Sequence, residues 1–253
     1  MTDETDEPDS AAHPFTRLTP DLVMDATESV GFQCDERILE LNSYENRVYQ
    51  IGIEDDEPVI GKFYRPERWT ESQILEEHTY TQLLADSDIS AVPPLIIDGS
   101  TLHEFDGYRF SLSPRRGGRA PAVDDLNTLE VLGSHIGRIH AVAGDGGFTY
   151  RPLFGLQEFG LDARDAVVAA GYIPAELMPA FDSLYDGILA DLAALFERVS
   201  VNTLRLHGDC HMGNVLWRDD LPHFVDFDDA RSCLLYTSPS PRDRTRSRMP
   251  SSA

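Results

Sequence analysis

The spacing of hydrophobic residues predicts that the first half of the chain is rich in strands. Short runs of hydrophobic and β-branched residues between polar turns are typical of strands. The predicted strands are residues 37–41, 47–53, 58–64, 91–97 and 108–112. Two helices accompany them, one over residues 20–32 and one after Thr70, where Gln73 completes a capping-box pattern. Beyond this cap, hydrophobic residues between Ile74 and Leu84 supply an apolar face over roughly four turns.

The second half has the periodicity of helices. Hydrophobic residues recur at helical spacing from Leu126 to Ile139 and again from Phe181 to Val199. Three short segments then resemble strands, namely residues 203–206, 214–217 and 223–225. Since strands dominate one half and helices the other, the layout predicts an α+β fold with two lobes. Clefts between lobes commonly hold ligands.

Composition agrees with a globular protein. The chain has 253 residues, of which 41% are hydrophobic and 26% charged, enough for one large domain or two small ones. No hydrophobic run approaches the length of a membrane span. Three widely spaced cysteines, Cys34, Cys210 and Cys233, do not form a disulfide framework. We therefore expect a reducing, cytoplasmic location.

The net charge limits the possible partners. Asp and Glu number 44 against 21 Lys and Arg, which gives a net charge of −23. Such a surface repels nucleic-acid phosphates, so we expect no nucleic-acid partner and, without a spanning segment, no membrane partner. All but one of the basic residues are arginines, and Lys62 is the only lysine.

The two ends differ from the rest of the chain. The first ten residues hold five acids and no base, which predicts a disordered lead-in. The last 21 residues carry four Arg and one Asp among many Ser and Pro, and their CLLYTS segment resembles a translated sequencing adaptor. We interpret this tail as non-native rather than as a natural basic arm, and exclude it from the fold. The predicted divisions are a lead-in over 1–15, an N-lobe over 16–113, a C-lobe over 114–232 and the tail over 233–253.

The residues that carry chemistry are concentrated between 207 and 229. Asp209 follows a predicted strand, Asn214 comes five residues later, and Asp226 ends another predicted strand. Phosphoryl transfer needs one carboxylate to accept the proton of the attacking hydroxyl, and an amide oxygen with a second carboxylate to hold Mg²⁺ against ATP. The alternative is a turn-rich hairpin whose acids only cap loops.

A zinc site is a further alternative for this segment. His207, Cys210 and His211 lie close together, but zinc takes four ligands in a structural site, or three and a water in a catalytic one. No second Cys/His pair has suitable spacing. We therefore favour His207 as a packed anchor of the loop.

Lys62 lies in an apolar strand, where a lysine that points into a cleft can neutralise ATP phosphates. The helix after Thr70 offers Glu77 as the acid that holds this lysine. An ordinary exposed strand residue is the alternative. No G-x-G-x-x-G loop is present, and the turn at residues 42–46 takes its place. Its backbone, with Ser43 and Asn46, can approach phosphates, but a plain polar hairpin turn fits the sequence equally well.

Three segments together resemble the bacterial stress response kinase A family. They are LNSYENRVYQ, KFYRPERWTESQILEEH and LRLHGDCHMGNVLWRD followed by FVDFDDAR. The resemblance runs from about Thr16 to Arg231 and implies a Ser/Thr protein kinase with the aminoglycoside phosphotransferase-like, protein-kinase-like fold. The family continues beyond Arg231 with further helices, so we expect an incomplete C-lobe that exposes apolar helix faces and aggregates.

The resemblance also implies roles for individual residues. Asp209 is the proton acceptor, Asn214 and Asp226 bind Mg²⁺, and Asp226 is also an active-site residue. Ser43 contacts ATP, with Lys62 and Glu77 as the ion pair that anchors phosphate. Residues 110–114 are expected beside adenine as the hinge, and Asp228 and Asp229 brace the metal loop. The implied protein is a monomer that binds ATP and phosphorylates a protein in a stress response; an amino-alcohol or sugar kinase and an inert nucleotide-binding domain are the alternatives.

Overall fold

The computed structural model describes residues 14–144, 146–198 and 203–234. The chain forms two compact units. The first contains the described residues up to Gln82 together with Val92–Gly117, and the second contains Leu83–Ala91 and the described residues from Gly118 onward. The division after Gly117 lies close to the predicted division between an N-lobe ending at residue 113 and a C-lobe beginning at residue 114.

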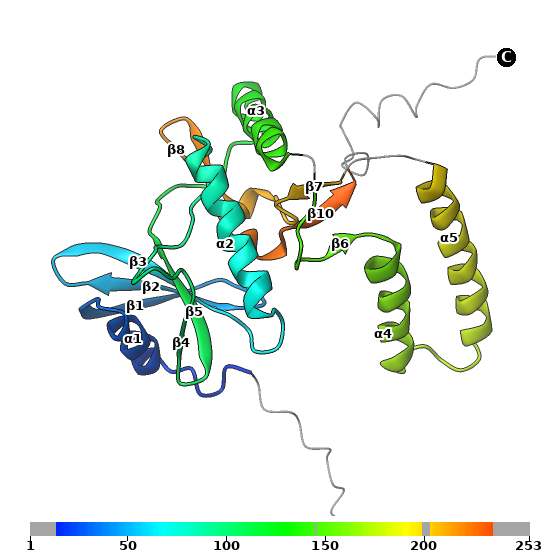
Figure 1. Ribbon diagram of the computed structural model, residues 1–253, viewed down its shortest axis with the longest axis horizontal. Helices are drawn as coiled ribbons and strands as arrows, with labels where there is room; N and C mark the ends of the chain where they lie inside the picture. The colour runs from blue at the N-terminus through cyan, green and yellow to red at the C-terminus, as the bar shows by residue number, and fades with distance from the viewer. Residues whose placement is uncertain (1–13, 145, 199–202, 235–253) are drawn as a thin grey trace, which may run out of the picture. The chain divides into compact units, whose positions relative to one another are not determined.

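The first unit is built on one antiparallel five-stranded sheet with the order β1-β2-β3-β5-β4 (Figure 1). Its strands are β1 (Cys34–Leu41), β2 (Arg47–Ile53), β3 (Asp56–Phe63), β4 (His103–Phe105) and β5 (Tyr108–Pro114). The strands predicted at 37–41, 47–53, 58–64 and 108–112 are thereby confirmed. The short strand β4 was not predicted.

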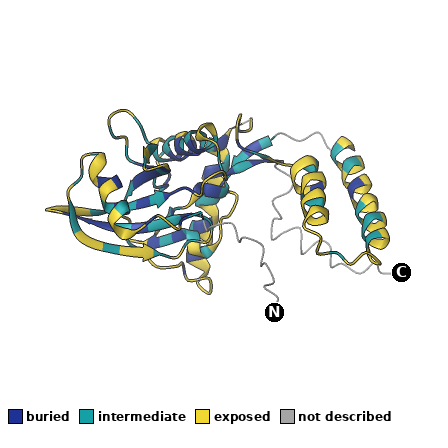
Figure 2. Cartoon of the chain, turned by 90° about the horizontal axis from the view of Figure 1, so that it is seen from below, coloured by how far each residue is buried: buried dark blue, intermediate teal, exposed yellow. Residues whose placement is uncertain are grey.

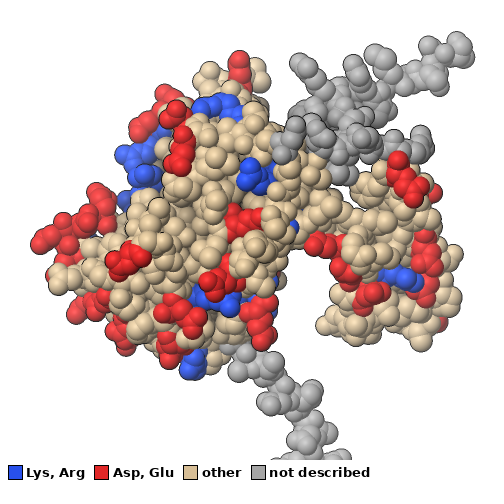
Figure 3. All heavy atoms as spheres, viewed as in Figure 1, with Lys and Arg blue, Asp and Glu red and all other residues tan. Residues whose placement is uncertain are grey.

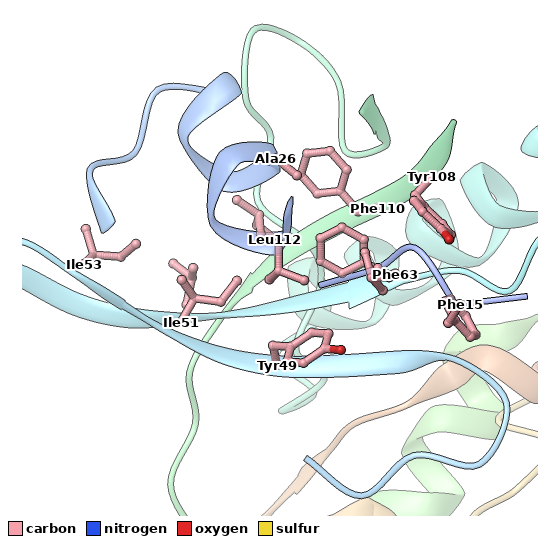
Figure 4. Close-up of a cluster of buried hydrophobic side chains, with 12 residues drawn as sticks. Phe15, Ala26, Tyr49, Ile51, Ile53, Phe63, Tyr108, Phe110 and Leu112 are labelled. Atoms are coloured by element: carbon pink, nitrogen blue, oxygen red, sulfur yellow. The ribbon is translucent and has the colours of Figure 1, made fainter. Parts of the chain in front are cut away.

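One face of this sheet packs against α1 (Pro20–Ser29). The Thr19 side chain caps the helix by accepting from the Leu22 amide, and Pro20 stands at the first position, where its missing N–H costs nothing. Figure 4 shows the resulting core, in which Ala26 of α1 lies among aromatic and aliphatic residues of β2, β3 and β5. Phe63 and Phe110, from neighbouring strands, stack with ring centroids 5.3 Å apart.

The predicted lead-in ends earlier than expected. Residues 1–13 lie outside the described part of the chain, but Phe15 is 7% exposed and belongs to the core. Its ring stacks on Tyr108, whose hydroxyl donates to the Pro14 carbonyl. Burial of an aromatic side chain contributes roughly 1.5–3 kcal/mol, so Pro14 and Phe15 belong to the folded unit.

The opposite face of the sheet meets α2 (Glu71–Asp86) through the hydrogen bond between Tyr64 and His78. The predicted capping box is confirmed. The Thr70 amide donates to Gln73 Oε1 over 2.9 Å, and the Gln73 amide donates to Thr70 Oγ1 over 3.3 Å.

The strand predicted at 91–97 is wrong. This segment makes only isolated bridges, at Ala91 with Phe224 and at Ile97 with Ser100. It contains Pro93 and Pro94, whose nitrogens cannot donate to a strand ladder.

The second unit combines helices with two small sheets. Its helices are α3 (Leu126–Ala143), the π-helix η1 (Gln157–Asp162), α4 (Ala163–Ala169), α5 (Met178–Arg198) and the short 3₁₀ turns η2 (Met212–Asn214) and η3 (Phe227–Asp229). Its strands are β6 (Leu153–Phe154), β7 (Thr203–Leu206), β8 (Val215–Arg218), β9 (Leu221–Phe224) and β10 (Arg231–Leu234), paired in the orders β6-β10-β7 and β8-β9.

Strand β10 extends the fold into the segment that the sequence analysis excluded. Cys233 pairs with Leu204 of β7 and with Phe154 of β6, and it is 6% exposed. The fold therefore includes Cys233 and Leu234. Residues 235–253 lie outside the described part, and their non-native origin stays a prediction.

Helices α4 and α5 both expose apolar side chains. Figure 2 shows both helices coloured largely as exposed or intermediate. On α5, four hydrophobic residues at helical spacing are 38–67% exposed: Leu184, Ile188, Leu192 and Leu195. Contiguous apolar faces of this kind promote association.

Acidic side chains dominate the face seen in Figure 3, in agreement with the net charge of −23. Among the described residues, none of the helices combines the length and hydropathy that a membrane span requires.

Candidate active site

The turn between β7 and β8 holds Asp209 and Asn214 together. The Asn214 side-chain nitrogen donates to the main-chain carbonyl of Asp209 over 3.0 Å, and the His211 amide donates to the same carbonyl over 2.9 Å. Because an amide group has its donor and acceptor on opposite branches, this bond directs Asn214 Oδ1 away from the turn. Asp209 is exposed and Asn214 is half-buried.

The segment that leads into Asp226 is bonded through its backbone to Asn214. The Val225 amide donates to the Asn214 carbonyl over 3.1 Å, so the residue before Asp226 is tied to the predicted metal ligand. Asp226 adopts a left-handed conformation, with φ 59° and ψ 66°, as the chain enters η3. Such a conformation costs about 1–3 kcal/mol and is frequent at functional sites. The structure thus ties Asp209 and Asn214 to the residue that directly precedes Asp226.

His207 links the two halves of this arrangement. Its Nε2 lies 3.0 Å from the Val225 carbonyl, and its Nδ1 accepts from the Asp209 amide over 3.4 Å. Its ring centroid is 4.3 Å from that of Phe227. Burial lowers the pKa of the imidazole below 6.5, so the ring is neutral at pH 7, with Nε2 as donor and Nδ1 as acceptor. His207 is therefore the packed anchor that the sequence favoured.

Gly208 allows the closest approach between the two segments. Its φ is +87°, and a Cβ built there would lie 1.8 Å from the carbonyl oxygen of Asp229. A residue with a side chain cannot occupy this position without moving the backbone that follows Asp226.

Two arginines brace η3. Arg151, 4% exposed, donates from Nε to the Ala230 carbonyl over 3.0 Å and from Nη1 to the Asp228 carbonyl over 3.1 Å. Arg231 pairs with Asp229 at 2.7 Å. Sequence reasoning missed Arg151 because it lies 77 residues before Asp228, with no local motif around it.

The donor set fits magnesium better than zinc. His207 uses both ring nitrogens in hydrogen bonds to the backbone, so it is not a ligand. Within the described residues, no group of three or more His, Cys, Asp or Glu has the geometry of a metal site. Asn214 and Asp226 offer two hard oxygen ligands, and magnesium commonly completes its shell with phosphates and water.

His211 lies beside the predicted proton acceptor. Its Nδ1 accepts from the Gly213 amide over 2.9 Å, and its Nε2 lies 3.5 Å from Asp209 Oδ2. A Cβ on Gly213 would come within 2.6 Å of the His211 ring. This arrangement directs the imidazole toward the carboxylate, a relation that the sequence analysis did not identify.

Lys62 and Glu77 flank one buried pair in the first unit. Lys62, half-buried on β3, places Nζ 5.3 Å from the ring centroid of Tyr64. Glu77 on α2 is 6% exposed, and its Oε2 lies 4.0 Å from His78 Nε2. Tyr64 and His78 are hydrogen-bonded to each other. The two predicted phosphate-anchoring residues therefore lie beside one bonded pair, Lys62 at Tyr64 and Glu77 at His78. The ion pair itself stays a prediction.

The turn at residues 42–46 is held from outside. Asn46 is 3% exposed and accepts from the Arg65 amide over 3.1 Å, so its side chain is structural and not a phosphate contact as suggested. Glu45 pairs with Arg65 at 3.1 Å and with Arg68 at 2.6 Å. These arginines are therefore surface pairs. Ser43 is half-buried in the middle of this braced turn.

The expected hinge is displaced. Residues 110–114 belong to β5 and pair with β3 from Phe63 to Val59, and Phe110 is fully buried. The connector between the units follows the strand, from Arg115 to Gly118.

Comparisons with known proteins agree with this arrangement. The model of the phosphotransferase enzyme family matches residues 37–234. Stress response kinase A of Escherichia coli O157:H7 is 42% identical over 223 residues, covering 88% of this chain and 67% of the relative. "Serine/threonine protein kinase RdoA" of Salmonella typhimurium is 41% identical over 221 residues, covering 87% of this chain and 67% of the relative. The chain spans about two thirds of the length of these relatives.

Solved structures show the same fold. The amicoumacin kinase hAmiN, in complex with AMP-PNP, Ca²⁺ and Ami, has a TM-score of 0.67 at 22% identity, over 83% of this chain and 65% of that one. A microcompartment-associated aminopropanol kinase has a TM-score of 0.58 at 16% identity, over 83% and 70%. At such identities the likeness is one of fold.

Proposed function

The chain belongs to the phosphotransferase enzyme family, and within it to the stress response kinase A family, and from this premise we propose that it transfers the γ-phosphoryl group of ATP to a Ser or Thr hydroxyl of a protein. The observation that carries the proposal is the set of backbone and side-chain bonds that joins Asp209, Asn214 and the residue before Asp226. This set combines a proton acceptor with two magnesium ligands.

Asp209 acts as the general base. Its carboxylate is exposed to an incoming hydroxyl, while its backbone is fixed by Asn214 and His211. A fixed base accepts the hydroxyl proton as the oxygen attacks phosphorus, and such proton transfer contributes about 10²–10⁴-fold to a rate.

Asn214 Oδ1 and the Asp226 carboxylate would hold Mg²⁺. When bound, the ion neutralises charge on the transferring phosphates. The chain contributes the orientation of its ligands, through the bond from Asn214 to the Asp209 carbonyl and the left-handed backbone at Asp226.

The first unit supplies the phosphate anchor in this proposal. Lys62 is the point charge for the ATP phosphates, Glu77 holds it, and Ser43 contacts the nucleotide from the braced turn between β1 and β2. Support comes from the placement of Lys62 and Glu77 against Tyr64 and His78.

The names of the relatives, stress response kinase A and serine/threonine protein kinase RdoA, favour a protein acceptor and a stress response. The named acceptors of the structural neighbours are small molecules, but the likeness to them, 16–22% identity, is one of fold. We propose a cytoplasmic enzyme with ATP and a protein as its partners, because three widely spaced cysteines are too few for the disulfide framework of a secreted protein.

Transfer of radiolabel from γ-labelled ATP tests the proposal. With Mg²⁺, label is expected in a generic Ser/Thr-containing protein and not in amino alcohols or aminoglycosides, and chelation of the metal abolishes transfer. Label in a small alcohol alone contradicts the protein acceptor. Absence of both nucleotide binding and turnover contradicts the kinase proposal.

A further inference from the structure

A chain of hydrogen bonds lies buried in the first unit, outside the residues that the proposed mechanism uses. The Tyr64 hydroxyl is 2.7 Å from His78 Nε2 and 3.0 Å from Ser111 Oγ. The other nitrogen of the imidazole, Nδ1, is 2.8 Å from Thr101 Oγ1. Tyr64, His78 and Ser111 are 4%, 2% and 2% exposed. The chain joins the end of β3, the middle of β5, the segment before β4 and the helix α2.

The network can be satisfied in either direction. Protons are donated from Ser111 through Tyr64 and His78 to Thr101, or from Thr101 through His78 and Tyr64 to Ser111. Loss of one bond would leave a buried polar group unpaired, which is unfavourable. A network at this depth therefore specifies one position of α2 relative to the sheet.

The two residues proposed to anchor phosphate, Lys62 and Glu77, lie beside members of this network. Lys62 pairs with Ser111 across β3 and β5, and its Nζ lies 5.3 Å from the Tyr64 ring centroid. Glu77 directly precedes His78 on α2, and its Oε2 is 4.0 Å from His78 Nε2. A shift of α2 along the sheet would therefore move Glu77 relative to Lys62.

We propose that Tyr64 and His78 are positioning residues, which set the place of Glu77 and Lys62 for the phosphates of ATP. The inference rests on the proposed function and deepens it. An ordinary core residue contributes to stability without a specific effect on nucleotide affinity. Tyr64 and His78 should affect nucleotide affinity as well as stability.

The test compares two tyrosines of the same unit in the full chain. Tyr64→Phe removes the hydroxyl that bonds to His78 but keeps the ring beneath Lys62. Tyr108→Phe is the matched control, because Tyr108 is also 4% exposed and its hydroxyl donates to the Pro14 carbonyl on the other face of the sheet. The measurements are the Kd of Mg·AMP-PNP by calorimetry, KM and kcat for ATP, and Tm.

We expect Tyr64→Phe to raise both Kd and KM for the nucleotide by about 5- to 30-fold, a loss comparable to one or two buried hydrogen bonds. We expect kcat of Tyr64→Phe to change less than its KM. The Tyr108→Phe control should bind nucleotide with a Kd within about twofold of the parent, although its Tm should fall by about as much as that of Tyr64→Phe. Ser111→Ala, which removes a single bond from the network, is expected to give a smaller rise in Kd and serves if Tyr64→Phe fails to fold.

Lys62→Met separates the two levels of the proposal. If Lys62→Met weakens nucleotide binding while Tyr64→Phe and Ser111→Ala bind as tightly as the Tyr108→Phe control, the positioning role is wrong and the proposed function stands. If Lys62→Met binds nucleotide like the parent, or the parent does not bind it, the phosphate anchor is wrong and the positioning role falls with it.

Discussion

His207 Nε2 lies 3.0 Å from the main-chain carbonyl oxygen of Val225, and this single contact ties the turn that carries Asp209 to the segment that leads into Asp226. The two segments are 18 residues apart at this bond. Because the imidazole is buried and both of its ring nitrogens bond to the backbone, it acts as a fixed spacer between the proposed proton acceptor and a proposed metal ligand.

Replacing His207 should damage both stability and transfer. His207→Ala removes the bond to Val225 and the packing against Phe227, and we expect a loss of about 2–4 kcal/mol in the free energy of unfolding. Denaturation in urea checks this value. The control is His135→Ala, whose ring bonds to the Val131 carbonyl of its own helix and which should cost less than about 1 kcal/mol. Equal losses in the two variants would contradict the spacer role.

Gly208 offers a sharper test of the same contact. In Gly208→Ala the new methyl would meet the Asp229 carbonyl, so we expect a loss of more than about 3 kcal/mol and disrupted transfer. Gly171 also has a positive φ, +69°, but open space around a built Cβ. Gly171→Ala should therefore cost only backbone strain, about 1 kcal/mol. Thermal unfolding of both variants decides; similar Tm values would contradict the close approach.

The proposed site residues Asp209, Asn214 and Asp226 could be found from the sequence because their pattern is local. They lie within one short stretch of turns and strands. Arg151 and Phe15 were not predictable in this way, since each acquires its role from a contact with residues at least 77 positions distant. Strand β10 was missed because its composition suggested a foreign tail, while pairing with β7 decides its structure.

The stripe on α5 should drive self-association. Leu184, Ile188, Leu192 and Leu195 expose apolar surface along one helix. We expect the parent chain to associate as its concentration rises, and Leu184→Lys with Ile188→Glu to shift it toward monomer in sedimentation velocity. Leu189 is 8% exposed, so Leu189→Lys should instead unfold the helix pair. A parent chain that stays monomeric at all concentrations would show that the stripe has no such effect.

Glu45 makes the stability of the turn between β1 and β2 depend on pH. Burial alone would raise the pKa of Glu45, but Arg68 and then Arg65 outweigh it and hold that pKa below 4.5. A carboxylate with a lowered pKa contributes stability above its ordinary pKa, and this contribution is lost as pH falls through the lowered value. Because Glu45 and its two arginines are partly exposed to solvent, this contribution to stability is limited to about 1 kcal/mol.

Glu45→Gln should therefore lose stability at pH 7 and differ less from the parent at pH 3, measured as urea midpoints across this range. The control is Glu36→Gln, on β1, which removes a carboxylate of the same sheet that does not belong to this brace. If Glu45→Gln is as stable as the parent at pH 7, the brace contributes nothing.

Single-turnover transfer by Asp209→Asn tests the central claim most directly. Asparagine keeps the size of the side chain and the backbone bonds from Asn214 and His211, but it cannot accept the hydroxyl proton. The account predicts that this variant binds Mg·AMP-PNP with a Kd within about threefold of the parent, while its rate of phosphoryl transfer falls by about 10²–10⁴-fold. Transfer at the parental rate with undiminished nucleotide binding would show that Asp209 is not the base.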